Sequence, residues 1–247
     1  ADAEKEILPE DLIIGLNYNG ITRAYPQRIL NLHEIVNDKY NEEPIAVTFD
    51  PLSGAAIAFN RTVDGIITEF GVSGLLKESS LVMYDRYEGN LWEQISGRAI
   101  VGPAAKRDEI LTQIPVITTT WAEWKATYPE TEVLSRDTGH NGNYNAYPYG
   151  SYESDDQIYF KVENFDSTIQ IKTPVYGLNL DDQYKAYPIA TIKEKKSIED
   201  QIGDHKIIIL FKDNGEIVAT EDSKPIIGIR VFWFVWAALY PETELYQ

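Results

Sequence analysis

An internal repeat is the feature that most constrains how this chain folds. The motif Gly-Leu-Asn at residues 15–17 recurs 162 positions later, and so does Ala-Tyr-Pro at residues 24–26. A further motif, Tyr-Pro-Glu-Thr-Glu at residues 128–132, recurs 112 positions later. Self-similarity at a shared offset is typical of duplicated structural units. The smaller second offset predicts that the first copy contains about fifty residues that the second lacks.

Each copy is predicted to contain two short strands, a helix, a hairpin and a helix that carries tryptophans. Pro26 suits a first helical turn, and a helical stripe is predicted after it: Ile29, Leu32, His33, Val36 and Tyr40. Asn214-Gly215 predicts a hairpin turn because these residues tolerate positive φ, and residues 50–54 form the equivalent tip. The extra residues are predicted to be strands, at 66–72, 81–85, 91–95 and 99–101.

These elements predict an α+β fold that is predominantly β. It would consist of two diverged copies of a strand–strand–helix–hairpin–helix unit, the first with a β insertion. Residues 1–134 would form the first, site-bearing repeat, and residues 173–247 the shorter second repeat. Residues 135–172, rich in Asn, Gly and Tyr, would form an ordered connection, with all three parts packed as one globule.

Charge and cysteine content exclude several functions. The 247-residue chain has a net charge of −17 and no cysteine. A surface this negative repels nucleic-acid phosphates and anionic lipids, so protein or glycan partners are expected instead. Without cysteine, disulfides, thiolate catalysis and thiolate-bound metals are excluded.

The two ends of the chain bear on its location. The polar start at residues 1–6 is typical of a mature chain after signal-peptide removal, which predicts an extracytoplasmic protein, secreted, periplasmic or on the cell surface. The most apolar run, residues 226–240, is too short to cross a bilayer and contains Arg230. We therefore expect buried core there and no transmembrane segment.

Polar residues present only in the first copy are site candidates. His33 and Glu34 face lysines in the second copy, Asp50 faces Lys212, and Ser53 faces a glycine. Arg23, by contrast, faces Lys185, which makes that position a shared cation. The differences gather on the first helix and on the hairpin tip.

His33-Glu34 begins like the helical zinc-protease motif, but Asn37 stands where the second histidine belongs, which excludes that motif. On the apolar stripe His33 is expected to point inward, as a core histidine or as a site residue. Asp50 and Ser53 fit two interpretations: local turn chemistry, or a site for a hard cation or a hydrogen-bonding ligand.

A third candidate lies at residues 137–145, which resemble a calcium loop. Asp137 and two later residues supply oxygen atoms, but Pro148 stands where a bidentate glutamate belongs. The pattern excludes a helix-flanked calcium loop and leaves an irregular site or an Asn/Gly turn.

Several linked motifs together resemble a family of mostly secreted bacterial and archaeal proteins catalogued as domain of unknown function 3179. They cover most of the chain: residues 19–26, 33–38, 51–54, 64–65, 70–76, 81–86, 91–92, 137–139 and 148–149. Within these motifs we take Arg23, Tyr25, Asp85 and Trp92 as candidate ligand-binding residues.

The family's usual hairpin tip resembles Cys-Pro-Leu-Cys-Gly, which implies a metal or redox role. Asp50 and Ser53 replace both cysteines in this chain. Oxygen ligands favour Ca²⁺, Mg²⁺ or Mn²⁺, so Asp50, His33 and Asp137 are the candidate metal ligands. Alternatively, the site is degenerate.

Three functional hypotheses remain. The leading one is an extracytoplasmic binding or structural protein with a degenerate family site. The second is a metal-assisted or acid–base enzyme that uses His33, Glu34, Asp50 and Ser53, with Arg86 as an anion clamp. The third is a carbohydrate-binding module, which requires a row of exposed aromatic rings.

Overall fold

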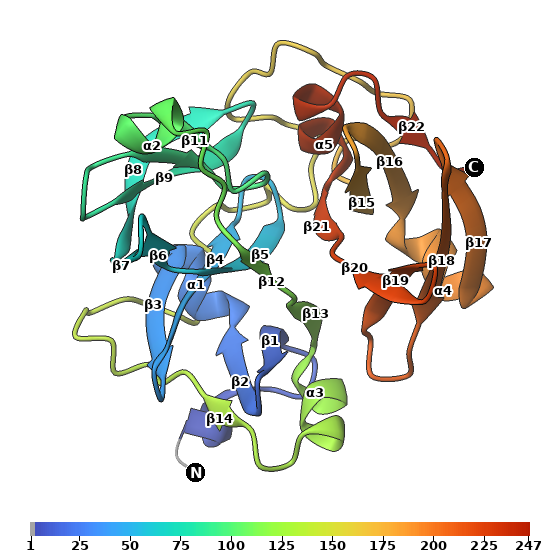
Figure 1. The fold of residues 1–247 in the computed structure, drawn as a ribbon. Helices are drawn as coiled ribbons and strands as arrows, with labels where there is room; N and C mark the ends of the chain where they lie inside the picture. The colour runs from blue at the N-terminus through green and yellow to red at the C-terminus, as the bar shows by residue number, and fades with distance from the viewer. Residues whose placement is uncertain (1–2) are drawn as a thin grey trace.

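The strands form a ring of five sheets, a five-bladed β-propeller (Figure 1). The computed structural model describes residues 3–247, so the first two residues of the polar start lie outside it. After a short 3₁₀ turn at Ala3–Glu6, the chain enters the first blade. In Figure 1, β12, β13, β20 and β21 lie near the middle of the ring.

Blades 1 and 2 are neighbours, joined by a short helix. Blade 1 has the order β13-β1-β2-β14, with bounds Ile117–Thr120, Leu12–Tyr18, Ile21–Pro26 and Glu132–Val133. Blade 2 has the order β12-β5-β4-β3, with bounds Gln113–Ile114, Ala55–Asn60, Glu43–Asp50 and Ile35–Tyr40. Helix α1 (Gln27–His33) connects them, and α3 (Trp121–Thr127) precedes β14.

Blade 3 is inserted between β5 and β12. Its order is β11-β10-β9-β8, with bounds Ala99–Val101, Leu91–Glu93, Ser80–Asp85 and Phe70–Lys77. A small hairpin, β6 (Thr62–Val63) and β7 (Ile66–Ile67), leads into the blade, and α2 (Pro103–Lys106) leads out.

Blades 4 and 5 follow the connecting segment, residues 135–172. Blade 4 has the order β21-β15-β16-β22, with bounds Ile229–Phe232, Pro174–Leu180, Gln183–Pro188 and Glu244–Leu245. Blade 5 has the order β17-β18-β19-β20, with bounds Ser197–Ile202, His205–Phe211, Ile217–Glu221 and Lys224–Ile226. Helix α4 (Ile189–Lys195) joins these blades, and α5 (Trp233–Leu239) precedes β22.

The predicted α+β fold of two repeated units is therefore wrong. The strands belong to five similar sheets in a ring, and the residues predicted as an insertion form a blade of their own. The first helix is also shorter than predicted. It ends at His33 because Glu34 has a φ of 58°, so Val36 and Tyr40 lie on β3. The predicted division into residues 1–134, 135–172 and 173–247 is not tested by this arrangement of blades and stays a prediction.

The repeated glycine and tryptophan motifs have a packing explanation. A Cβ atom on Gly15 would lie 2.3 Å from the Trp124 ring, and one on Gly177 would lie 2.4 Å from the Trp236 ring. Each indole N–H then donates to a threonine seven residues further on, at 3.0 Å and 2.8 Å. Each tryptophan ring therefore requires a glycine, which has no side chain, at this position of the neighbouring strand.

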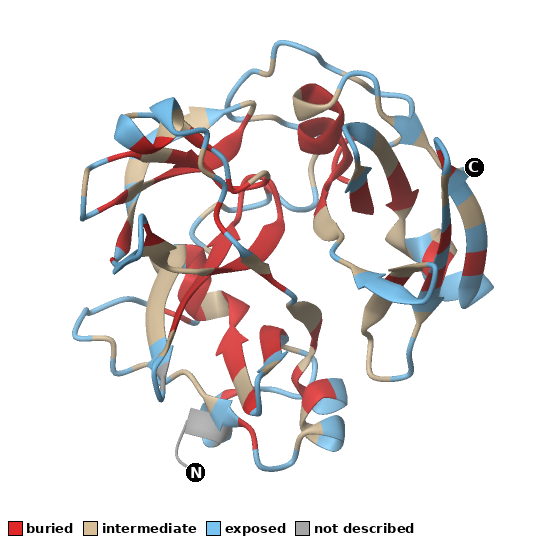
Figure 2. Cartoon of the chain, viewed as in Figure 1, coloured by how far each residue is buried: buried red, intermediate tan, exposed pale blue. Residues whose placement is uncertain are grey.

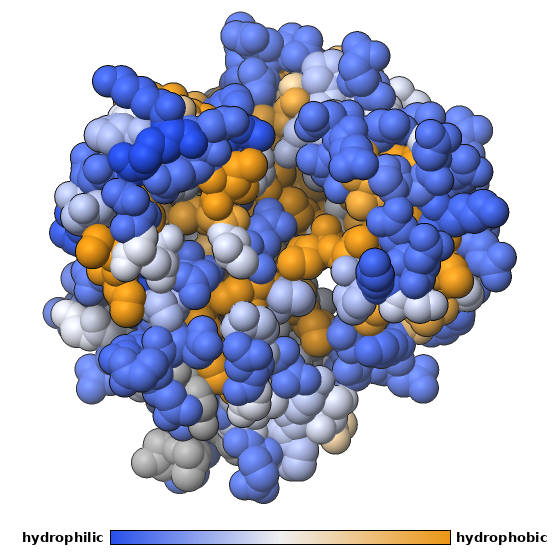
Figure 3. All heavy atoms as spheres, in the orientation of Figure 1, coloured by the Kyte–Doolittle hydropathy of each residue, from blue (hydrophilic) through white to orange (hydrophobic). Residues whose placement is uncertain are grey.

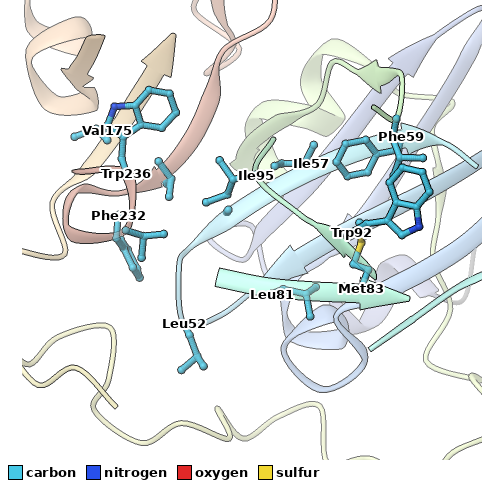
Figure 4. Close-up of a cluster of buried hydrophobic side chains, with 14 of the residues drawn as sticks. Leu52, Ile57, Phe59, Leu81, Met83, Trp92, Ile95, Val175, Phe232 and Trp236 are labelled. Atoms are coloured by element: carbon cyan, nitrogen blue, oxygen red, sulfur yellow. The ribbon is translucent and has the colours of Figure 1, made fainter. Parts of the chain in front are cut away.

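The largest apolar cluster lies where blades 2, 3 and 4 meet. Phe59 of blade 2, Trp92 of blade 3 and Trp236 of blade 4 belong to it, and all are nearly or fully buried (Figure 4). Figure 2 shows buried residues concentrated in the sheets, whereas the connecting segment is largely exposed. No helix within residues 3–247 is both long enough and apolar enough to cross a bilayer.

We expect Gly15→Ala to lower the free energy of unfolding by about 1–3 kcal/mol, the usual cost of overpacking a filled core. Urea denaturation measures this value. In a Trp124→Leu background the same substitution should cost much less, because the ring that the new methyl group meets is gone. Equal costs in both backgrounds would show that the tryptophan ring is not the constraint.

Candidate functional site

The β4–β5 hairpin tip, residues 50–54, is buried near the centre of the molecule. Asp50 is 2% exposed and Ser53 is fully buried. Asp50 Oδ1 accepts the Leu52 N–H at 2.9 Å, and Oδ2 accepts the Leu81 N–H at 3.0 Å. The first bond shapes the turn, and the second connects blade 2 to blade 3.

The carbonyl groups of the tip accept hydrogen bonds from other parts of the ring. The Tyr152 hydroxyl donates to the Leu52 carbonyl at 2.9 Å, and the Phe232 N–H donates to the Ser53 carbonyl at 2.7 Å. Arg230 Nη1 donates to the Gly54 carbonyl at 3.0 Å. The tip is therefore bound to the connecting segment and to blade 4 as well as to blade 3.

Glu34 lies beside Asp50, so the structure brings these two predicted site residues together. Burial, and then the charge of Asp50, raise the pKa of Glu34 to about 7. The Tyr149 hydroxyl, 3.4 Å from Glu34 Oε1, opposes this shift. Burial also raises the pKa of Asp50, against opposing hydrogen bonds from Ser53, Leu52 and Leu81. Burial thus raises the pKa of both carboxyl groups.

His33 takes part in a separate contact with the connecting segment. Its Nε2 lies 2.7 Å from the Tyr144 hydroxyl, which lies 2.6 Å from Thr138 Oγ1. The His33 and His140 rings are 5.5 Å apart, and burial, followed by the charge of His140, lowers the pKa of His33. His33 is partly exposed rather than sealed in an apolar core.

The candidates of blade 3 and of the connecting segment lie elsewhere. Asp85 is fully buried and accepts the Trp92 indole N–H at 2.8 Å, together with backbone N–H groups of its own turn. Arg86 is exposed and pairs with Glu69 at 3.4 Å. Asp137 is exposed.

Arg23 and Tyr25 have counterparts in blades 4 and 5. Arg23 pairs with Asp38 at 2.7 Å, and the Tyr25 hydroxyl donates to the same carboxylate. Lys185 pairs with Asp200 at 2.9 Å, and the Tyr187 hydroxyl donates to that carboxylate in the same way. Both groups connect the second strand of one blade to the outer strand of the next, which is a structural role.

The tip does not fit the metal-binding role considered from the sequence. Across residues 3–247, no group of three or more His, Cys, Asp or Glu side chains is placed to hold a metal ion. Both oxygens of Asp50 already accept N–H groups.

On the other side of the tip, a cavity of about 340 Å³ opens between blades 1, 4 and 5. Figure 3 shows apolar residues gathered around the hollowed middle of this face. Its charged lining residues are Glu123, Lys193 and Arg230, and most of its other walls are apolar or threonine. Sequence reasoning did not select Arg230, although a lone cation within the most apolar run was the available signal.

We expect Asp50→Ala to lower the free energy of unfolding by about 2 kcal/mol or more, because two buried backbone N–H groups lose their acceptor at about 1–3 kcal/mol each. Asp50→Asn, which keeps one oxygen acceptor, should cost less. Chemical denaturation compares both with Asp137→Ala, an exposed control. If Asp50→Ala matches that control, the tip does not depend on this carboxyl group.

We also expect Glu34 to make stability depend on pH. Because its pKa is higher in the folded chain, about 7 against an ordinary 4.5, the folded state holds its proton more tightly. This contribution is complete below pH 4.5 and is lost as the pH rises through 7. The free energy of unfolding of the unsubstituted chain should therefore fall across this window relative to that of Glu34→Gln.

Urea denaturation at several pH values measures this difference, with Glu163→Gln as an exposed control. A difference that stays constant from pH 4.5 to 7 would show that Glu34 is not held protonated by the fold.

Comparison with known proteins supports the family and nothing more specific. No curated protein and no solved structure matches the chain significantly. The family model described as a protein of unknown function, DUF3179, matches residues 1–226. The match spans most of the chain, so this five-bladed propeller belongs to the DUF3179 family.

Proposed function

We propose that this chain is a binding protein whose central cavity takes a small organic anion. The single observation behind this proposal is the Arg230 guanidinium. It lines the cavity and makes one hydrogen bond, to the Gly54 carbonyl. In the described part of the chain no carboxylate lies within 4.0 Å of it, and the charge of Glu153 acts on it from further away.

The electrostatics of the cavity favour an anionic ligand. Burial lowers the pKa of Arg230, yet an arginine side chain stays protonated in proteins. A buried charge is costly unless it is paired, and a carboxylate would match the guanidinium through two parallel hydrogen bonds. Lys193 adds a second positive charge to the wall.

Glu123, the one acidic residue of the lining, is already engaged. The Thr119 hydroxyl hydrogen bond, together with smaller effects that include the charge of Lys193, lowers its pKa. Its carboxylate also accepts the Thr120 N–H as part of the α3 capping box. Glu123 therefore caps a helix and neighbours Lys193, and Arg230 remains available to a ligand.

Size and lining restrict the ligand further. A cavity of about 340 Å³ is at the small end of the range for ligand sites. Apolar side chains contribute much of the wall: Val116, Ile117, Tyr176, Ile189, Phe211 and Ile217. An anion with a compact apolar body fits this lining, whereas the net charge of −17 disfavours polyanions such as nucleic acid.

The extracytoplasmic location remains part of this proposal, supported by the resemblance to mostly secreted proteins. The enzyme hypothesis has one supporting observation, the Glu34 pKa of about 7, which suits acid–base catalysis. However, Glu34 does not line the central cavity. The carbohydrate hypothesis has weaker support, because it requires a row of exposed, coplanar rings. The exposed Tyr159 ring packs on the buried Tyr152 ring at a tilt of 55°, so this pair does not form such a row.

Benzoate and its neutral isostere benzamide test the proposal. We expect benzoate to raise the thermal unfolding midpoint and to bind saturably in calorimetry, whereas benzamide should do neither. Arg230→Gln should weaken benzoate binding by about tenfold or more, since losing one partner of a buried charge pair costs about 2–5 kcal/mol. Arg230→Lys should keep part of the affinity because it keeps the charge.

Lys224→Gln is the matched control, because it makes the same change in net charge at an exposed position outside the cavity. Equal binding of benzoate and benzamide would contradict the proposal. So would unchanged benzoate binding by Arg230→Gln, or a failure of benzoate to bind at all.

A further inference from the structure

A second cavity, of about 270 Å³, lies between α1, the start of β1 and the connecting segment. It is separate from the central cavity, with which it shares only Leu12. Its lining comes from three stretches that are distant in sequence: residues 10–12, Gln27, Arg28 and Asn31 of α1, and residues 144–147.

Two amide side chains of this lining have buried oxygen atoms without a partner. They are Gln27 Oε1 and Asn31 Oδ1, and the two residues are only 9% and 8% exposed. The Gln27 Nε2 group donates to Glu153 Oε1 at 3.3 Å, which fixes the orientation of the amide and leaves its oxygen free. Because the residues are four apart on a helix, both lie on the same face.

A third unsatisfied atom lies on the opposite wall. The Tyr147 hydroxyl has no hydrogen-bond partner within 3.5 Å. Burial, the charge of Glu153 and a weaker hydrogen bond to that carboxylate raise its pKa, and a hydroxyl that donates to Glu153 still has its oxygen free to accept. Three atoms that can accept a hydrogen bond therefore line one cavity from two different elements. Buried polar groups in proteins are almost always paired, so such a group of unpaired acceptors points to a ligand.

The fold itself does not require these residues. Helix α4 follows β16 just as α1 follows β2, and each helix begins after a proline cap. At the positions 162 residues after Gln27, Arg28 and Asn31, α4 has Ile189, Ala190 and Lys193. A helix at this place in a blade therefore forms without the two amides.

We propose that this cavity binds the primary ammonium group of a small amine. An ammonium group carries three N–H donors and no acceptor, which matches three unpaired acceptors. The charge agrees, since Arg28 is already paired with Asp11 while Glu10 on the rim and Glu153 beside Gln27 remain acidic. The rings of Tyr144 and Tyr147 in the wall also suit a cation.

Three probes of similar size distinguish the possible ligand chemistries: n-butylamine, n-butanol and butyltrimethylammonium. Titrations followed by ¹H–¹⁵N NMR in 0.15 M salt should show saturable shifts with n-butylamine, centred on residues 27–31 and 144–147. The alcohol has one donor and no charge, and the quaternary ion has charge without a donor. Both should bind at least about tenfold more weakly, because hydrogen bonds to a charged donor are the strong ones.

Gln27→Leu and Asn31→Leu should each weaken n-butylamine binding by about tenfold, whereas Gln157→Leu, at an exposed position, should leave it unchanged. Asn31→Leu removes no hydrogen bond formed within the described chain, so it should fold normally and remain decisive if Gln27→Leu does not. Arg230→Gln should bind the amine like the unsubstituted chain, so this site and the central cavity are tested separately.

Every other result would overturn the inference. Equal binding of n-butanol would show that the cavity recognises hydroxyl groups, and equal binding of the quaternary ion would show that charge alone is recognised. Saturation by none of the probes would show that water satisfies the three atoms. Unchanged affinity in both leucine variants would place the amine elsewhere.

Discussion

The hydrogen bonds of the β4–β5 tip are the interaction on which the rest of the structure depends. Four residues of this turn make the contacts. Asp50 bonds to blade 3, Ser53 and Gly54 bond to blade 4, and Leu52 bonds to the connecting segment. Blades 3 and 4 are not consecutive in the chain, so side chains and hydrogen bonds must hold them together. The hydrogen bonds of a buried polar turn fix the relative orientation of the two blades, which apolar contacts alone cannot do.

The same turn accounts for the two polar residues of the tip. Asp50 and Ser53 place oxygen acceptors at the ends of the turn, where they accept the Leu52 and Ala55 N–H groups. Local turn chemistry, one of the two interpretations of these residues, accounts for their contacts. The adjacent Glu34, with a pKa of about 7, remains the one group of this region poised to exchange a proton.

Local features of this fold were predictable from sequence, and its closure was not. β1 and β2 are the two short strands predicted at the start of the first copy. Gly15 and Trp124 belong to motifs that the repeat singled out, and their contact explains why both recur. The five-bladed ring was not predicted because β12 and β13 return to blades begun some fifty or more residues earlier. No local pattern encodes that return. The prediction that the first helix continues to Tyr40 was wrong, because the helix ends at His33. The positive φ of Glu34 goes with the hydrogen bond from the Phe49 N–H to its carbonyl, a contact that helix propensity does not describe.

The candidate sites show the same division. Comparison between the repeated motifs separated the shared Arg23 position from Glu34 and Asp50, and in the structure the charge of Asp50 helps to raise the pKa of Glu34. It could not select Arg230, Gln27 or Asn31. Their surroundings, and not their sequence context, single them out: Arg230 lines a cavity without an ion-pair partner within 4.0 Å, and the Gln27 and Asn31 side-chain oxygens have no hydrogen-bond donor.

The route of the chain has a consequence for the central cavity. Covalent connections run among blades 1–3 and between blades 4 and 5, so the ring consists of two arcs that meet at two seams. One seam, between blades 3 and 4, is filled by the large apolar cluster. At the other, between blades 5 and 1, Thr119 Oγ1 lies 3.1 Å from the Asn214 carbonyl beside the cavity. The first seam is therefore held by apolar packing, whereas the second is bridged by a hydrogen bond at the edge of the cavity, so a change at Thr119 would act on the closure of the ring and on the cavity together.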